Sequence, residues 1–132
     1  MGAWGIKTFE NDDSSDWLYD LEESDDLSVL ESALNEAEQD YIEAPEGCNI
    51  LAAAEVILGL QGKGRELPEN AQEWIEKNKG LNVSTLVTVA IKAVDAVLSD
   101  KSELFELWQD AEEDFENWKS DVESIKAALS VS

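Results

Sequence analysis

The chain has 132 residues, of which 43% are hydrophobic, and it carries a formal net charge of −22 with no histidine and one cysteine. This length and hydrophobic fraction predict one domain, residues 1–132, with a real core, and they argue against global disorder. The negative charge disfavours nucleic acid as a partner, and no apolar run approaches the roughly 20 residues that span a bilayer.

The first two helices are predicted from a hydrophobic period of 3.6 residues. Asp12 or Asp13 is a suitable N-cap for a helix over about 13–23, with Trp17 on its apolar side. After the interruption ESDD, apolar residues recur every three or four positions and predict a second helix over about 26–40.

The middle of the chain predicts three more helices. Pro45 suits the first turn of the third helix, and Glu55 is the only charge between residues 47 and 60, so this helix should be central. A fourth helix is expected over about 68–78. Residues 84–98 could alternate as a strand, but their polar side chains recur at steps of three and four, which favours a helix.

The last segment, about 101–130, has apolar residues in alternating steps of four and three. One continuous helix here would be roughly 45 Å long at 1.5 Å per residue, longer than the roughly 36 Å diameter of a compact chain of this size. The helix therefore either overhangs the domain or breaks near residues 112–117. Its first half has the wider apolar stripe and is expected to be the more buried.

These elements predict an all-α fold: a single compact domain of about six helices, with an extended N-terminal arm and a long C-terminal helix. The arm, residues 1–11, should pack on the helices through Trp4 and Phe9, since both are large and apolar. Deleting residues 1–10 is then expected to lower the melting temperature. An unchanged melting temperature with loss of a ligand would make the arm a binding element instead.

The missing histidine excludes histidine-based acid–base chemistry, Ser-His and Cys-His nucleophile pairs and histidine-containing zinc sites. Cys48 has no visible activating base and is interpreted as a small core residue. A single cysteine allows no internal disulfide, which fits a reducing compartment. Residues 1–20 lack the basic start and the apolar stretch of a signal peptide. We therefore expect a cytoplasmic protein that does not bind membranes.

Carboxylates are the only residues that could carry metal chemistry. ExxE pairs at 103–106 and 113–116 have the spacing of helical magnesium sites, but their register places them on the solvated face, opposite the core. Asp12, Asp16 and Asp20 lie one turn apart, without the glycine turn of a calcium loop. The sequence thus predicts no catalytic, cofactor-binding or metal-binding residue, and no cofactor.

Glu55 is the candidate buried carboxylate. A carboxylate buried without a partner would have a raised pKa and could carry a proton or bind a cation. The favoured alternative is that Glu55 tilts to the rim of the core or pairs with Arg65 or Lys63.

The acidic residues are unevenly distributed along the chain. Residues 1–46 hold 15 acids and one base, residues 47–101 hold seven and six, and residues 102–132 hold nine and two. We expect one face to carry most of the negative field and to attract a basic protein, unless the charge serves solubility alone. The candidate partner surface is built by the arm and the first two helices: Trp4, Asp12, Asp13, Asp16, Tyr19, Asp20, Glu23, Asp25 and Asp26.

Three stretches carry a resemblance to a known family: MGAWGIKTFENDDSSDWLYDL, AAAEVILGLQGKGRELPENAQEWI and SELFELWQDAEEDFENWKSDVESIKAAL. In this order they resemble bacterial proteins of the domain of unknown function 4259 family. Ile6, Lys7 and Thr8 fill a gap where small residues are more usual in the family. The resemblance implies a native N-terminus, a cytoplasmic bacterial domain and no established activity, and it transfers no catalytic residue.

Two classes of function remain open at this point. The first is a non-enzymatic protein-interaction module, with an immunity-type or antagonist partner of a basic protein as one form. The alternative is a carboxylate-dependent metal-binding protein or hydrolase. The partner, the biological process and the oligomeric state are not specified by the sequence.

Overall fold

The computed structural model describes residues 7–63 and 67–130, and within these ranges it contains α-helices and no strand. The elements are α1 (Asp12–Glu22), α2 (Ser28–Asn35), the 3-10 helix η1 (Glu36–Glu38), α3 (Ala44–Leu60), α4 (Glu69–Lys77), α5 (Ser84–Val97), α6 (Glu103–Asp110) and α7 (Phe115–Ser130). The all-α prediction is confirmed, and the ambiguous segment beginning at residue 84 is helical. The predicted last helix forms two helices, so the described residues hold seven α-helices.

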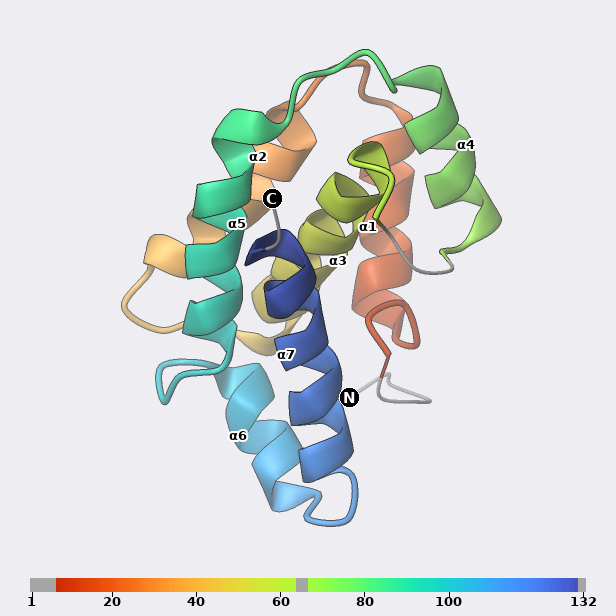
Figure 1. Cartoon of the computed structure of the whole chain (residues 1–132). Helices are drawn as coiled ribbons and strands as arrows, with labels where there is room; N and C mark the ends of the chain where they lie inside the picture. The colour runs from red at the N-terminus through yellow and green to blue at the C-terminus, as the bar shows by residue number, and fades with distance from the viewer. Residues whose placement is uncertain (1–6, 64–66, 131–132) are drawn as a thin grey trace.

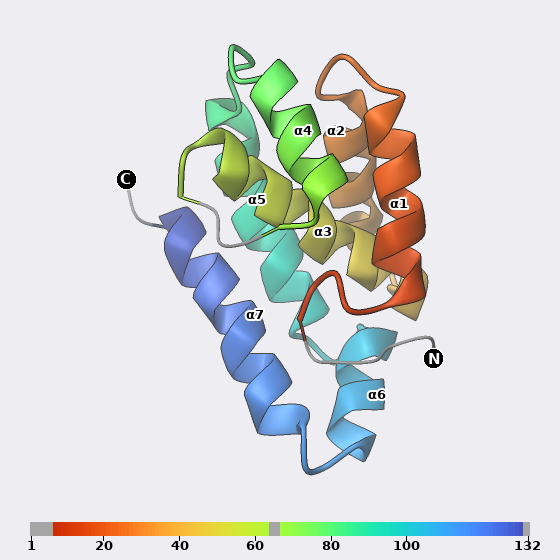
Figure 2. The same ribbon diagram turned by 90° about the vertical axis from the view of Figure 1, so that its right-hand side faces the viewer.

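Helix α3 is the centre of the fold, as its composition predicts. It is buried along most of its length and is surrounded by α1, α2, α5 and α7 (Figures 1 and 2). Three consecutive alanines, Ala52 to Ala54, are fully buried, so neighbouring helices can approach closely. Gly47 serves the same purpose, because a Cβ atom there would lie 3.3 Å from the Cβ of Leu104 on α6.

The N-terminal end of α1 is capped by Asn11, and not by Asp12 or Asp13 as the sequence suggested. Asn11 has the extended backbone of an N-cap, and its Oδ1 accepts a hydrogen bond from the Ser14 N–H at 2.8 Å. The two aspartates lie in the first turn, where their charge favours the helix dipole.

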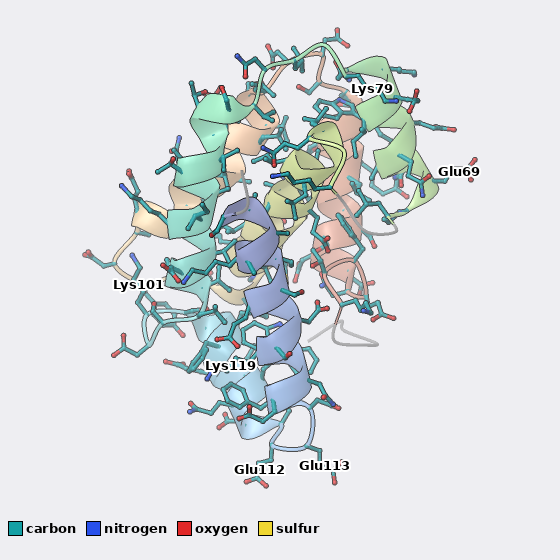
Figure 3. All side chains as sticks on the ribbon, viewed as in Figure 1. Glu69, Lys79, Lys101, Glu112, Glu113 and Lys119 are labelled. Atoms are coloured by element: carbon teal, nitrogen blue, oxygen red, sulfur yellow. The ribbon has the colours of Figure 1, made fainter. Side chains whose placement is uncertain are left out.

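The predicted second helix, over about 26–40, is shorter than expected because its end tightens into η1. The Lys101 ammonium donates to the carbonyl oxygens of Ala37 at 2.7 Å and Gln39 at 3.0 Å, which holds this end against the start of α6 (Figure 3). Next to it, Ile42 exchanges backbone hydrogen bonds with residues 101 and 103 in an isolated bridge. Tyr41 falls outside the helix and is exposed.

The C-terminal segment breaks at residues 111–114, within the region where the length argument allowed a break. Glu112 has a φ of 46°, a left-handed conformation that reverses the chain, so that α7 returns along α5 and α3 (Figure 2). Glu112 and Glu113 point outward at the tip of this turn (Figure 3). The first half is not more buried than the second: α6 buries two of its eight residues, Leu104 and Trp108, and α7 buries four of its sixteen, all along one side.

Replacing Glu112 with glycine should stabilise the protein. Glycine adopts a positive φ without the steric cost of a side chain, and the gain should exceed the added entropy of the unfolded chain, giving about 0.5–1 kcal/mol. Thermal and urea unfolding measure the change. Glu113→Gly is the matched control and should be neutral or destabilising, since Glu113 does not have a positive φ. Equal gains for both variants would show that lost charge repulsion, and not backbone strain, is the cause.

The described part of the N-terminal arm packs on the domain. Thr8 is buried, Phe9 is partly buried against the core, and the Lys7 ammonium lies 3.6 Å from the Asp121 carboxylate on α7. Phe9 is thus less enclosed than predicted. Trp4 lies outside the described residues.

Candidate functional site

Helix α1 presents an acidic surface on the outside of the domain. Its buried side consists of Ser14, Trp17, Leu18 and Leu21, which pack toward α3 and α4. Successive residues of an α-helix are rotated by about 100° around its axis. The exposed residues on the side opposite the buried one therefore fall within a sector of roughly 100° around that axis. All of them are exposed, and we call this set the α1 face: Asp12, Asp16, Tyr19, Asp20 and Glu23.

Tyr19 is the apolar element of the α1 face. Its side chain is 65% exposed, the most of any large hydrophobic residue in the described ranges. Because a tyrosine ring combines apolar area with a hydroxyl group, an exposed tyrosine among charges is a typical anchor in protein interfaces. The α1 face therefore brings together the five described residues of the predicted surface that share one side of a helix.

The other predicted surface residues have different positions. Asp13 is half-buried beside α3, and Trp4 is outside the described residues. Asp25 and Asp26 lie in the turn between α1 and α2, and both are exposed. Asp26 stabilises the start of α2: hydrogen bonding with the Ser28 side chain, and a hydrogen bond that the Asp26 carboxylate accepts from the Ser28 N–H at 3.0 Å, lower the pKa of Asp26.

No basic residue offsets the charge of this region from within. Residues 8–62 contain no lysine or arginine at all. The Lys7 ammonium pairs with Asp121, and the Lys101 ammonium is bound to backbone carbonyl groups. None of the ion pairs between described residues involves a carboxylate of the α1 face.

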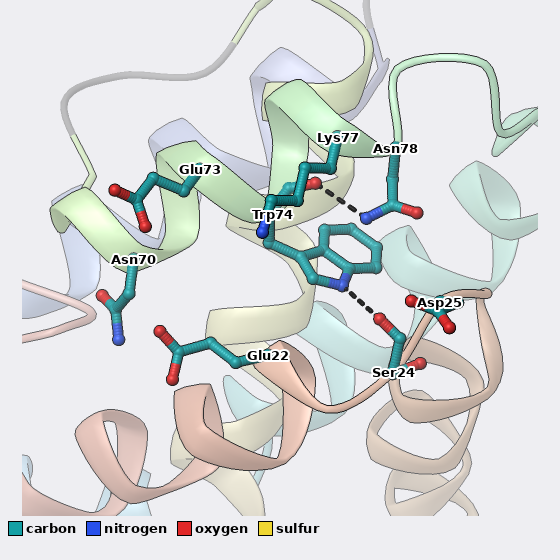
Figure 4. Close-up of a pocket in the computed structure, with 8 residues that line it drawn as sticks. All are labelled: Glu22, Ser24, Asp25, Asn70, Glu73, Trp74, Lys77 and Asn78. Atoms are coloured by element: carbon teal, nitrogen blue, oxygen red, sulfur yellow. Dashed lines mark hydrogen bonds between the residues drawn. The ribbon is translucent and has the colours of Figure 1, made fainter.

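A pocket lies on one flank of α1, between its C-terminal end and α4, and we call it the α1–α4 pocket (Figure 4). Its volume is about 230 Å³. The Trp74 indole N–H donates to the Ser24 carbonyl oxygen at 2.8 Å, which fixes α4 to the turn after α1. The residues that line the α1–α4 pocket are Glu22, Ser24, Asp25, Asn70, Glu73, Trp74, Lys77 and Asn78.

A second hollow lies on the other flank, between α1 and α2, and we call it the α1–α2 groove. Its volume is about 310 Å³. Asp20 belongs both to this groove and to the α1 face, so the two are continuous. The lining residues come from α1, α2, η1 and α3: Trp17, Asp20, Ser28, Val29, Ser32, Ala33, Glu36 and Asn49.

Sequence reasoning missed both hollows. Trp17 was expected on the apolar side of its helix, and it is buried, as are Trp74, Trp108 and Trp118. The sequence contains no signal for the hollows beside them, because they depend on which helices pack side by side.

The carboxylates considered for metal chemistry are used in other ways. The Glu103 side chain is half-buried and accepts a hydrogen bond from the Ala44 N–H at 2.7 Å, and Glu106 accepts one from the Tyr41 hydroxyl at 3.2 Å. The expectation that Glu103 is fully solvated is therefore wrong, since α6 packs against the start of α3. Within residues 7–63 and 67–130, no three potential metal ligands cluster.

Glu55 is buried on α3, with a side chain only 2% exposed. The candidate carboxylate is therefore buried and does not tilt to the rim, and its pairing with Arg65 or Lys63 stays a prediction. Its helix is enclosed on several sides, which leaves no rim at this position.

Cys48 is a core residue and not a nucleophile. Burial, together with the nearby Asp13 carboxylate, raises the pKa of the Cys48 thiol to about 12. Alkylation by iodoacetamide at pH 8 should therefore be on the order of a thousandfold slower in the folded protein than in the unfolded chain. Mass spectrometry with and without denaturant measures this ratio. Rapid labelling of the folded protein would contradict the assignment.

None of the described helices is long and apolar enough to cross a membrane. No curated protein and no solved structure matches the chain. One family does match: the family described as Domain of unknown function (DUF4259) matches residues 2–121, so the chain belongs to that family, as the resemblance indicated.

Proposed function

We propose that this member of the DUF4259 family is a non-enzymatic interaction module whose α1 face binds a basic protein. The observation that carries the proposal is an exposed tyrosine, Tyr19, on an acidic helix face within a stretch, residues 8–62, that contains no lysine or arginine. An immunity-type or antagonist protein that blocks a basic partner is the form of this function that we favour.

Charge and anchor have separate roles in this proposal. The negative field of the α1 face steers a cationic protein toward it, and salt weakens this attraction because the Debye length falls to about 8 Å at physiological ionic strength. Steering alone gives a fast encounter but little affinity. Tyr19 supplies contact area beside the charges, with Asp16 and Glu23 about one turn away from it on the same face.

The chemistry of the remaining carboxylates also supports an interaction module. Glu103 and Glu106 hold the start of α3 and the segment before it, and Asp26 holds the turn before α2. These groups stabilise the fold through hydrogen bonds, and a reaction does not need to be invoked to explain them.

The test is an affinity capture from the lysate of the native cell at low salt and at high salt. The expected result is a basic protein that is retained at low salt and released as salt rises. Tyr19→Ala should reduce its retention, whereas Val89→Ala, an exposed apolar residue on α5, should not. Recovery of no basic protein at low salt, or retention that ignores salt, would contradict the proposal.

A further inference from the structure

We propose that the α1–α2 groove receives one arginine side chain of the basic partner. The inference rests on the proposed function and names the group that is recognised beside the α1 face. It is carried by three observations on the groove: its size and apolar wall, its acidic rim, and a buried acceptor without a hydrogen bond.

The size and the wall of the groove suit a single long side chain. Its volume of about 310 Å³ is at the lower end of the range for small-molecule sites, roughly 300–1,000 Å³. Trp17, Val29 and Ala33 provide apolar surface for the methylene stem of an arginine, which packs on such surface while its charged end stays polar. A large cofactor would not be enclosed here.

The rim supplies negative charge without a competing cation. Asp20 and Glu36 line the groove, and none of the described residues that line it is basic. The Asp20 carboxylate makes no hydrogen bond or ion pair with any residue in the described ranges. Glu36 accepts one hydrogen bond from the Gln39 side chain, which leaves further acceptor capacity on its carboxylate.

The third observation is an acceptor that lacks a donor. Asn49 comes from the central helix, and its Oδ1 is buried and accepts no hydrogen bond from the part of the chain that the structure describes. An unpaired buried acceptor destabilises a fold, so its presence beside a cavity points to a donor from outside. A guanidinium group has five N–H donors in a planar fork and can bond an amide oxygen and a carboxylate together.

The α1–α4 pocket is the weaker candidate for the same role. It also contains carboxylates, those of Glu22, Asp25 and Glu73, but Lys77 already places an ammonium group among its lining residues. The buried polar group of that pocket, the Trp74 indole N–H, is satisfied by Ser24. An incoming cation would therefore meet a like charge, and among the described lining residues it would find no buried acceptor that lacks a hydrogen bond.

The experiment is an NMR titration of the ¹⁵N-labelled protein with N-acetyl-arginine amide, and it needs no knowledge of the partner. We expect saturable shifts of the backbone amides of residues 28–33 and of the Asn49 side-chain amide. The citrulline analogue, which has the same shape without the charge, and the lysine analogue, which lacks the fork, should both bind more weakly.

Two variants test the contacts, and one serves as the control. Asp20→Asn and Asn49→Leu should each weaken binding of the arginine probe by at least roughly threefold, the loss expected for one hydrogen bond. Asp20 is exposed, so its variant should fold normally even if Asn49→Leu does not. Glu22→Gln removes a charge from the opposite flank of α1 and should leave the affinity unchanged.

Several results would overturn the inference. They are shifts that spread over all acidic residues without saturation, equal binding of the citrulline or lysine analogue, and an unchanged affinity in Asp20→Asn. None of these results depends on capture of a partner. Failure of the groove is therefore distinguishable from failure of the proposed function, which would appear as the absence of a salt-sensitive basic protein in the capture experiment.

Discussion

Replacing Trp118 with alanine should lower the free energy of unfolding by about 3–5 kcal/mol, the usual range for a large aromatic residue in a core. Its side chain is 2% exposed. The indole stacks on Trp108 with ring centroids 6.1 Å apart and meets the edge of Phe105 at 6.3 Å. The substitution would leave a cavity where α6 and α7 pack together.

Urea unfolding measures this effect through the midpoint and the slope of the transition. Because total stability is typically only about 5–15 kcal/mol, the variant should be partly unfolded at elevated temperature. Tyr19→Ala is the matched aromatic control and should change stability by less than about 0.5 kcal/mol, since Tyr19 is exposed. A loss below about 1 kcal/mol in the Trp118 variant would contradict the packing of α6 on α7.

Reversing two charges on the α1 face should abolish capture of the basic partner. The double variant Asp16→Lys, Asp20→Lys replaces attraction by repulsion at the centre of the α1 face, and association at low salt should fall by roughly 10–1,000-fold. Both side chains are exposed, so the fold should be retained. Surface plasmon resonance against the captured protein at several salt concentrations measures the association rate.

The control for this variant changes the net charge by the same amount elsewhere. Glu116 and Glu123 are exposed on α7, on a different helix from the α1 face. At physiological ionic strength, where the Debye length is about 8 Å, their double reversal to lysine should reduce association by less than roughly threefold, because charges on another helix are then largely screened from a partner bound at the α1 face. Equal losses for the two double variants would show that net charge, and not the α1 face, controls binding.

The helices were predictable because each has a long apolar stripe or an apolar run of the right length. The periodic pattern places Trp17 on the apolar side of the first helix, and its burial confirms this. The composition of α3 identified the central helix, since a segment with a single charge at Glu55 is stable only when it is surrounded.

The errors in the prediction are at the ends of helices, where tertiary contacts compete with local pattern. Tyr41 fits the period of the second helix, but the helix ends before it. The Lys101 ammonium, more than 60 residues away along the chain, binds the Ala37 carbonyl oxygen at this end. The choice of Asn11 over Asp12 as the cap depends on a backbone conformation that the sequence does not encode by itself. Neither the register of the ExxE residues nor the period revealed that Glu103 reaches the start of α3.

The candidate site was predictable only in part. The α1 face follows from helical spacing alone, because five of the proposed surface residues lie opposite the buried side of one helix. The α1–α2 groove does not follow from spacing, since it needs Asn49 of the central helix to lie beside Asp20 and Ser32. The composition shows an excess of acids. It does not show that the Asn49 side-chain oxygen lies beside Asp20, because that depends on how the helices pack.

Zero-length carbodiimide cross-linking in the native lysate, read by peptide mass spectrometry, tests the central claim most directly. The reagent joins a carboxylate to a lysine amine only where the two are in contact, so it identifies which acids meet the partner. We predict amide links from Asp16, Asp20 and Glu23 to lysines of one basic protein, lost at high salt. Links that instead concentrate on residues 110–116, or that are spread evenly over many proteins, would contradict the assignment of the α1 face as the binding surface.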